Sequence, residues 1–153
     1  MTIKNDVIDT GLVEFVLPFD RGEEKIYFNP NDIDFFIRLS DMVENIGSIY
    51  EKAFVEYDAA ESGKEKLEVS RKLNDDIKEC FDVGFGNKVS DTIFKYVSPN
   101  GFVKAKNQYY PYYILEWLMP KIEEETGKTP KAAMSALEKA MNKHASKYPH
   151  KFK

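Results

Sequence analysis

Apolar residues between Ile33 and Tyr57 recur every three or four positions, and this periodicity constrains the fold more than any other feature. Side chains at this spacing lie on one face of an α-helix. The pattern predicts one long helix over about residues 31–58, with Gly47 as its weak point. The residues that carry the pattern are Ile33, Phe36, Ile37, Met42, Val43, Ile46, Tyr50, Ala53, Phe54 and Tyr57.

The start of this helix has several sequence signals. Asn29 can cap the exposed N–H groups, Pro30 suits the first helical position, and Asp32 complements the helix dipole. Phe28 and Ile33 are spaced to form a hydrophobic staple. We therefore predict a helix that begins directly after Pro30.

Two short β-type segments precede the helix, LVEFVL (12–17) and EKIYF (24–28). The segment between them, PFDRGE (18–23), contains the turn formers proline, aspartate and glycine. This arrangement predicts a β-hairpin over about residues 12–28, with one apolar face that a helix must cover.

Further helices are predicted over about 64–82, 89–97, 109–126 and 131–148. The helix at 109–126 is rich in aromatic residues. Pro120 lies inside it and predicts a kink or a break.

Charge divides the chain at Gly127. Residues 127–153 contain seven lysines and one acid, a charge of +6, whereas the whole chain carries −4, so residues 1–126 carry −10. Within residues 31–83, 14 acids and seven basic residues give −7. The basic segment is alanine-rich and can form an amphipathic helix that is marginal alone. It can dock on its own acidic body, on a neighbouring copy or on another protein.

These patterns predict an α+β, mainly α fold. Residues 1–126 are expected to form one globular domain, with the hairpin packed on a bundle of about four helices that spans residues 31–122. Residues 127–153 are expected to form a basic appendage.

The composition favours a well-packed intracellular protein. Of its 153 residues, 42% are hydrophobic and 14% aromatic, which is ample for a core. The one cysteine, Cys80, has no intrachain disulfide partner, and we expect it to pack as an apolar residue in a reducing compartment. The N-terminus has no long apolar run and no stretch approaches the ~18 residues of a membrane span. We expect a cytoplasmic protein with no membrane association.

Motifs for chemistry are absent from the sequence. The segment Thr126 to Thr129 resembles the end of a phosphate-binding loop, but Ile122 stands where that loop needs glycine. The two histidines, His144 and His150, both lie in the basic segment, which is unfavourable for a nucleophile pair or a metal site. We expect no enzyme activity, no catalytic residue, no cofactor and no metal.

Two regions are candidates for binding a partner. The first is residues 88–113, where basic residues alternate with aromatic ones; single-stranded nucleic acid could stack there, although an aromatic stripe on a helix is usually core or protein interface. The second is the basic segment. The candidate partner-binding residues are Met134, Leu137, Lys139, Met141, Lys143, Lys147, Tyr109, Tyr113 and Trp117.

The order of elements resembles the tail assembly chaperones of long-tailed (siphovirus-type) phages. The resemblance rests on residues 13–39, VEFVLPFDRGEEKIYFNPNDIDFFIRL, and 79–101, ECFDVGFGNKVSDTIFKYVSPNG. The second stretch is similar to the family's Phe-Asp pair, glycine turn and short helix.

The resemblance implies a non-enzymatic helper of phage tail morphogenesis, encoded by a phage or prophage and active in the host cytoplasm. Such chaperones bind the tape measure protein, keep it soluble and recruit tail tube subunits. We expect a homo-oligomer as well, because the basic segment and the Tyr109–Trp117 face are broader than one small core needs. The alternative is a small nucleic-acid-binding or regulatory protein that uses residues 88–113 and the basic segment.

Overall fold

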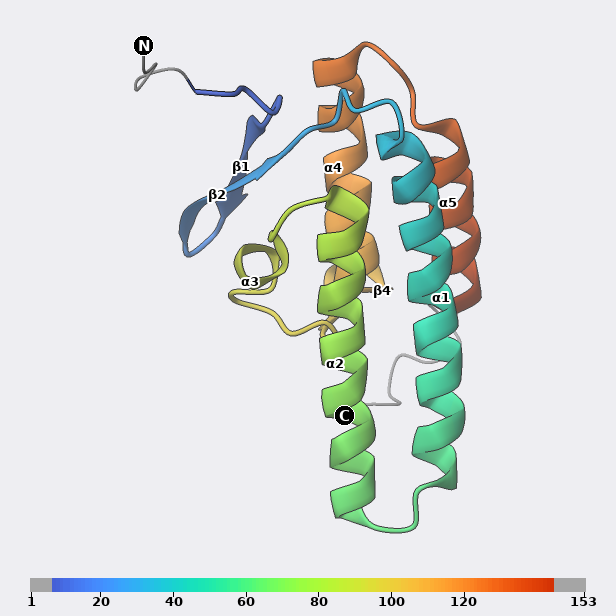
Figure 1. Cartoon of the computed structure of the whole chain (residues 1–153). Helices are drawn as coiled ribbons and strands as arrows, with labels where there is room; N and C mark the ends of the chain where they lie inside the picture. The colour runs from blue at the N-terminus through green and yellow to red at the C-terminus, as the bar shows by residue number, and fades with distance from the viewer. Residues whose placement is uncertain (1–6, 145–153) are drawn as a thin grey trace.

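A computed structural model describes residues 7–144 and shows an α+β, mainly α fold (Figure 1). A β-hairpin lies beside a bundle of four longer helices, as the sequence predicts. The strands are β1 (Val13–Phe19), β2 (Gly22–Phe28), β3 (Phe102–Val103) and β4 (Gln108–Tyr109); the helices are α1 (Phe35–Ala59), α2 (Gly63–Phe85), α3 (Ser90–Ile93), the 3₁₀ helix η1 (Lys104–Lys106), α4 (Tyr110–Thr126) and α5 (Lys131–His144).

The hairpin is confirmed, with β1 and β2 antiparallel and Phe19 paired with Gly22 across a two-residue connection. Its inward face is aromatic and aliphatic. Phe28 stacks on Phe15, at a centroid distance of 4.3 Å, and meets Phe85 of α2 at 4.7 Å. The hairpin is therefore fixed to the bundle through its apolar face, as expected.

The predicted start of α1 is wrong. The helix begins at Phe35, not directly after Pro30. Before it, the chain forms two successive turns, each closed by a hydrogen bond from a backbone N–H group to a polar side chain. Asn29 Oδ1 accepts from the N–H of Asn31 and Asp32 Oδ1 accepts from that of Asp34. The predicted staple is also absent, because Ile33 is 92% exposed.

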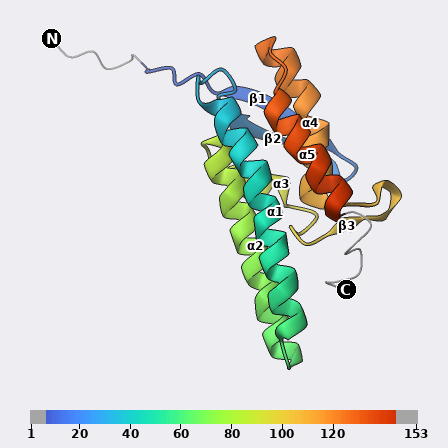
Figure 2. The same cartoon turned by 90° about the vertical axis from the view of Figure 1, so that its right-hand side faces the viewer.

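Helices α1 and α2 pack side by side and extend beyond the other helices (Figures 1 and 2). Ser62 caps α2 by accepting from the N–H of Glu65. Gly84 allows close packing, since a Cβ there would lie 2.5 Å from Met42 Sδ. The expected end of α2 at residue 82 is three residues short, because Gly86, with φ of 68°, supplies the left-handed cap.

The segment after α2 is less helical than predicted. Instead of a helix over 89–97, α3 is a single turn whose N–H groups at Val89 and Ser90 donate to the Asp82 carboxylate. The small sheet β3–β4 was not predicted. In contrast, α4 continues through Pro120, so of the predicted kink or break the break does not occur. Proline has no N–H group, so the carbonyl of Glu116 loses its helical hydrogen bond. Glu116 and Pro120 are both exposed, so water can reach this part of the helix.

The described part of the basic segment packs on the rest of the molecule. Helix α5 lies along α1 and also contacts α4 (Figure 2). Ala133, Leu137 and His144 are its buried residues. Gly127 ends α4 in the left-handed conformation, so the expected boundary coincides with a change of element while the hydrophobic core continues across it. The part of the predicted helix after His144 lies outside the described residues.

Candidate protein-binding groove

An open groove lies between the hairpin and α4. It has a volume of about 460 Å³ and apolar walls. Three segments build it: the end of β1 with its turn, the segment from Tyr96 to Val103, and the first half of α4. Its lining residues are Leu17, Pro18, Phe19, Asp20, Arg21, Tyr96, Val97, Val103, Tyr110, Tyr113, Ile114 and Trp117.

The floor of the groove is held rigidly. Tyr110 donates its hydroxyl proton to the carbonyl of Ile93 at 2.6 Å and meets the Phe94 ring edge-on. Burial raises the pKa of Tyr110 above its ordinary range, so the phenol stays a neutral donor. On the opposite wall, Phe19 meets Tyr96 edge-on at a centroid distance of 5.2 Å. These contacts join the walls without filling the space between them.

Cations border the groove. The Arg21 guanidinium lies 5.4 Å from the Tyr96 ring centroid, and Lys121 Nζ lies 5.0 Å from that of Trp117. Neither forms an ion pair with any residue in the range 7–144. Asp20 is the one carboxylate among the lining residues. The groove therefore offers aromatic surface next to positive charge.

The aromatic residues that we predicted as partner-binding divide into two groups. Tyr113 and Trp117 are half-buried and line the groove. Tyr109 is 2% exposed and packs against Tyr50 and Phe54 inside the core. The aromatic residues predicted as one binding surface thus contribute both to the hydrophobic core and to the accessible wall of the groove.

The residues predicted in the basic segment are also divided. Leu137 is buried and Met141 is half-buried, whereas Met134 is 40% exposed and Lys139 is exposed. Lys143 forms an ion pair with Glu51 at 2.7 Å. Lys147 lies outside the described residues. Helix α5 therefore faces α1 and α4 with its apolar side and solvent with its lysines.

His144 forms a network that the sequence did not reveal. It is 1% exposed, with Nδ1 2.8 Å from the Tyr112 hydroxyl and Nε2 3.0 Å from Glu51 Oε1. Hydrogen bonds from Lys143 and His144 lower the pKa of Glu51. An ionised Glu51 only accepts, so His144 Nε2 donates a proton to it. The network holds the end of α5 on the body.

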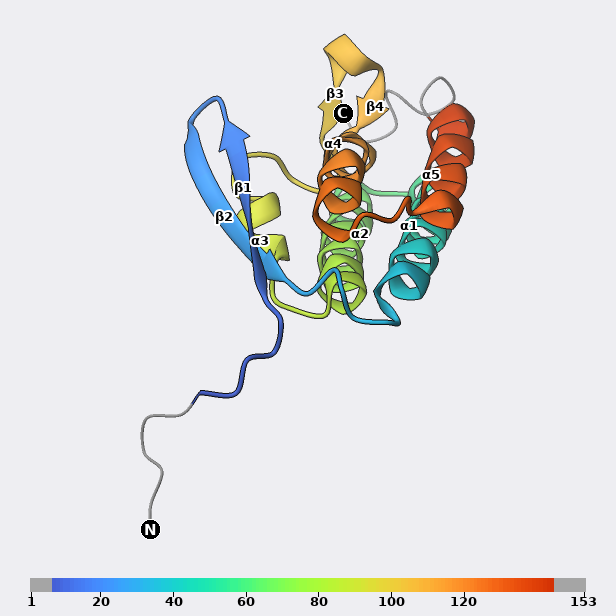
Figure 3. The same ribbon diagram turned by 90° about the horizontal axis from the view of Figure 1, so that it is seen from above.

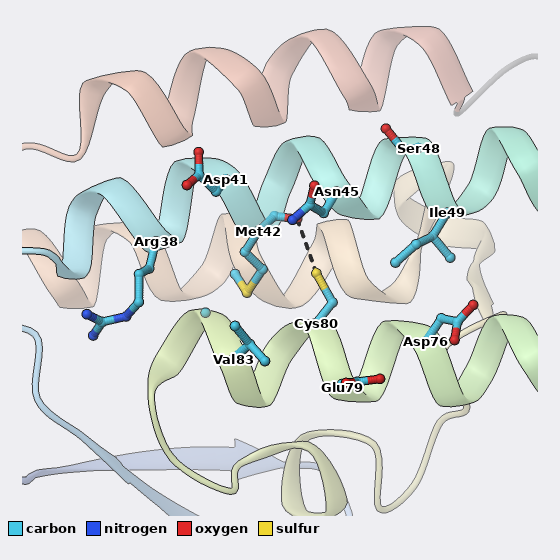
Figure 4. Close-up of a pocket in the computed structure, with 11 residues that line it drawn as sticks. Arg38, Asp41, Met42, Asn45, Ser48, Ile49, Asp76, Glu79, Cys80 and Val83 are labelled. Atoms are coloured by element: carbon cyan, nitrogen blue, oxygen red, sulfur yellow. Dashed lines mark hydrogen bonds between the residues drawn. The ribbon is translucent and has the colours of Figure 1, made fainter.

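A second groove runs between α1 and α2 (Figure 4). It has a volume of about 520 Å³ and is lined by charged residues above an apolar floor. The Cys80 thiol points into it and lies 3.5 Å from the Met42 carbonyl oxygen. Burial raises the pKa of Cys80 to about 11, so the thiol stays protonated at neutral pH and is a poor nucleophile.

The basic and aromatic region 88–113 does not form one continuous surface. Tyr109, Tyr110 and Tyr112 are buried, and Lys95 pairs with Glu24 of β2. Lys104 and Lys106 lie on η1. Few aromatic faces in this region are therefore free to stack on bases.

Sequence reasoning missed the other half of the groove. Leu17 belongs to the predicted apolar hairpin face, so its packing near α4 could have been anticipated, whereas Phe19 lay in the predicted turn. Tyr96 and Arg21 carried no signal, because only the three-dimensional packing brings them together.

In the part of the chain that the structure covers, no helix is long and apolar enough to cross a membrane. The same residues contain no cluster of three or more histidine, cysteine or acidic side chains that could hold a metal ion.

Comparisons with models of protein families, with curated proteins and with solved structures found no match.

Proposed function

We propose that this protein is a non-enzymatic assembly chaperone that holds an apolar segment of a partner protein in the groove between the hairpin and α4. The observation that carries the proposal is the open aromatic wall formed by Tyr113 and Trp117. Tyrosine and tryptophan contribute most to protein interfaces when they sit in a pocket with a polar rim. The groove has this composition.

The resemblance to phage tail assembly chaperones supports the choice of partner. Its two stretches, 13–39 and 79–101, contain the end of β1 with its turn and the residues Tyr96 and Val97, which line one wall of the groove. We therefore propose the tape measure protein as the partner held in the groove, with tail tube subunits recruited to the complex. A chaperone of this kind works in the host cytoplasm and acts by covering apolar surface.

Co-expression with the tape measure protein of the same phage tests this function. We expect a soluble complex with the wild-type protein. Trp117→Ala should weaken it by about 2 kcal/mol or more, roughly thirtyfold, because the side chain is a central anchor. The dissociation constant can be measured by calorimetry. Leu67→Ala, which truncates an apolar residue that is 51% exposed on α2, is the matched control and should bind like wild type.

Two results would oppose this function. One is the absence of any soluble complex with the tape measure protein. The other is salt-dependent binding of single-stranded DNA or RNA at micromolar affinity, which would favour the nucleic-acid alternative.

A further inference from the structure

The two-stranded sheet β1–β2 has one covered edge and one open edge. On the outer edge of β2, the Asn87 side-chain amide donates to the Tyr27 carbonyl at 2.6 Å. Helix α3 also packs against β2, and Lys95 pairs with Glu24 of that strand. Along β1, Glu14 and Val16 are both exposed, and no strand within residues 7–144 pairs with their other side.

The register shows which main-chain groups face outward from β1. A two-residue connection makes the closing pair, Phe19 and Gly22, a hydrogen-bonded pair. Hydrogen-bonded and non-hydrogen-bonded pairs then alternate along the hairpin. The N–H and C=O groups of Glu14 and Val16 therefore point away from β2. The same alternation turns the Tyr27 carbonyl outward from β2, in agreement with its bond to Asn87.

The open edge of β1 reaches the groove at its C-terminal end, and Glu14 and Val16 continue the same edge beyond the lining residues. Leu17, Pro18 and Phe19 all line the groove, although neighbouring side chains of a strand point to opposite faces. Side chains from both faces of the sheet can line the same groove when the groove runs along the edge of the strand. Figure 3 shows β1 on the side of β2 that is nearer α4. An added strand would thus lie between β1 and the aromatic wall of α4.

We propose that the groove binds its partner as an added β-strand on the free edge of β1. This inference rests on the proposed function and specifies the conformation of the bound segment. The segment is extended, because the Glu14 and Val16 groups offer strand-type hydrogen bonds. Alternate side chains are apolar and contact Tyr113 and Trp117. The rim cations Arg21 and Lys121 complement acidic residues in the same segment.

Val16→Pro tests the strand pairing directly. The change removes the outward N–H of residue 16 and leaves the β1–β2 bonds intact, because proline is tolerated at an edge strand and Pro18 already occupies an equivalent position. We expect at least about a tenfold loss of affinity for the tape measure protein, since the partner's carbonyl loses its donor. Val16→Ala keeps the N–H and should bind like wild type.

Amide hydrogen exchange measured by NMR provides a test without any substitution. In the free protein, the amides of Glu14 and Val16 should exchange faster than those of Phe15 and Leu17. In the complex, the Glu14 and Val16 amides should become protected. If the amides of Glu14 and Val16 were already protected in the free protein, the edge of β1 would not be open and the proposal would be overturned.

The outcomes separate the two proposals. A complex that depends on Trp117 but forms equally well with Val16→Pro and leaves these amides unprotected would overturn strand addition and leave the chaperone function standing. Failure of wild-type protein to bind the tape measure protein would overturn both. Reversing a rim charge with Arg21→Glu should weaken binding, and unchanged affinity would overturn the expected acidic character of the partner segment.

Discussion

At the scale of single residues, close contacts show which side chains the fold depends on. Gly84 is the clearest case, because a Cβ at this position would lie 2.5 Å from Sδ and 2.8 Å from Cβ of Met42. The α1–α2 contact therefore needs glycine for space and not for backbone conformation. In contrast, a Cβ at Gly63, at the start of α2, would meet no atom within 4 Å.

We predict that Gly84→Ala destabilises the protein by about 1–3 kcal/mol, because α1 and α2 must separate or Met42 must move. Gly63→Ala is the matched control and should leave stability unchanged or raise it slightly, because alanine favours helix. Urea denaturation measures both free energies of unfolding. Equal stabilities for the two variants would contradict the close packing described here.

At the scale of elements, hydrophobic periodicity predicted the hairpin and the four longer helices, and the described helix ends agree to within one residue except at the start of α1 and the end of α2. The polar side chains at residues 29–34 form local turns that delay α1 to Phe35. The position of α5 was left open, because the residues that hold it are distant in sequence. His144 meets Tyr112 and Glu51 across separations of 32 and 93 residues. The spacing of apolar and polar residues within one segment does not indicate contacts between residues so far apart in the sequence.

The docking of α5 should depend on pH through Glu51. Lys143 and His144 lower its pKa below the ordinary value of 4.5. A carboxyl group with a lowered folded-state pKa stabilises the native state fully above its unfolded pKa, and this contribution is lost as pH falls through the folded value. The wild type should therefore exceed Glu51→Gln in stability above pH 4.5, and the difference should shrink at lower pH.

Denaturation of both proteins across this pH range measures the difference. A constant gap between wild type and Glu51→Gln from neutral to strongly acidic pH would contradict the described ion pairs.

At the scale of the whole molecule, the groove arises between elements that are far apart in the chain. The sequence identified Tyr113 and Trp117 as candidate binding residues, but their helical spacing did not separate them from Tyr109, which is core. The facing wall comes from β1 and its turn, about 90 residues earlier. Only the packing of the hairpin against the bundle shows which aromatic side chains remain accessible.

The most direct test of groove binding is the fluorescence of Trp117, because it is the chain's one tryptophan and lines the groove. Adding the tape measure protein, or a segment of it with its tryptophans replaced by phenylalanine, should exclude water from the indole. We predict a shift of the emission to shorter wavelength and weaker quenching by acrylamide. A stable complex with unchanged Trp117 emission and quenching would show that the partner binds elsewhere.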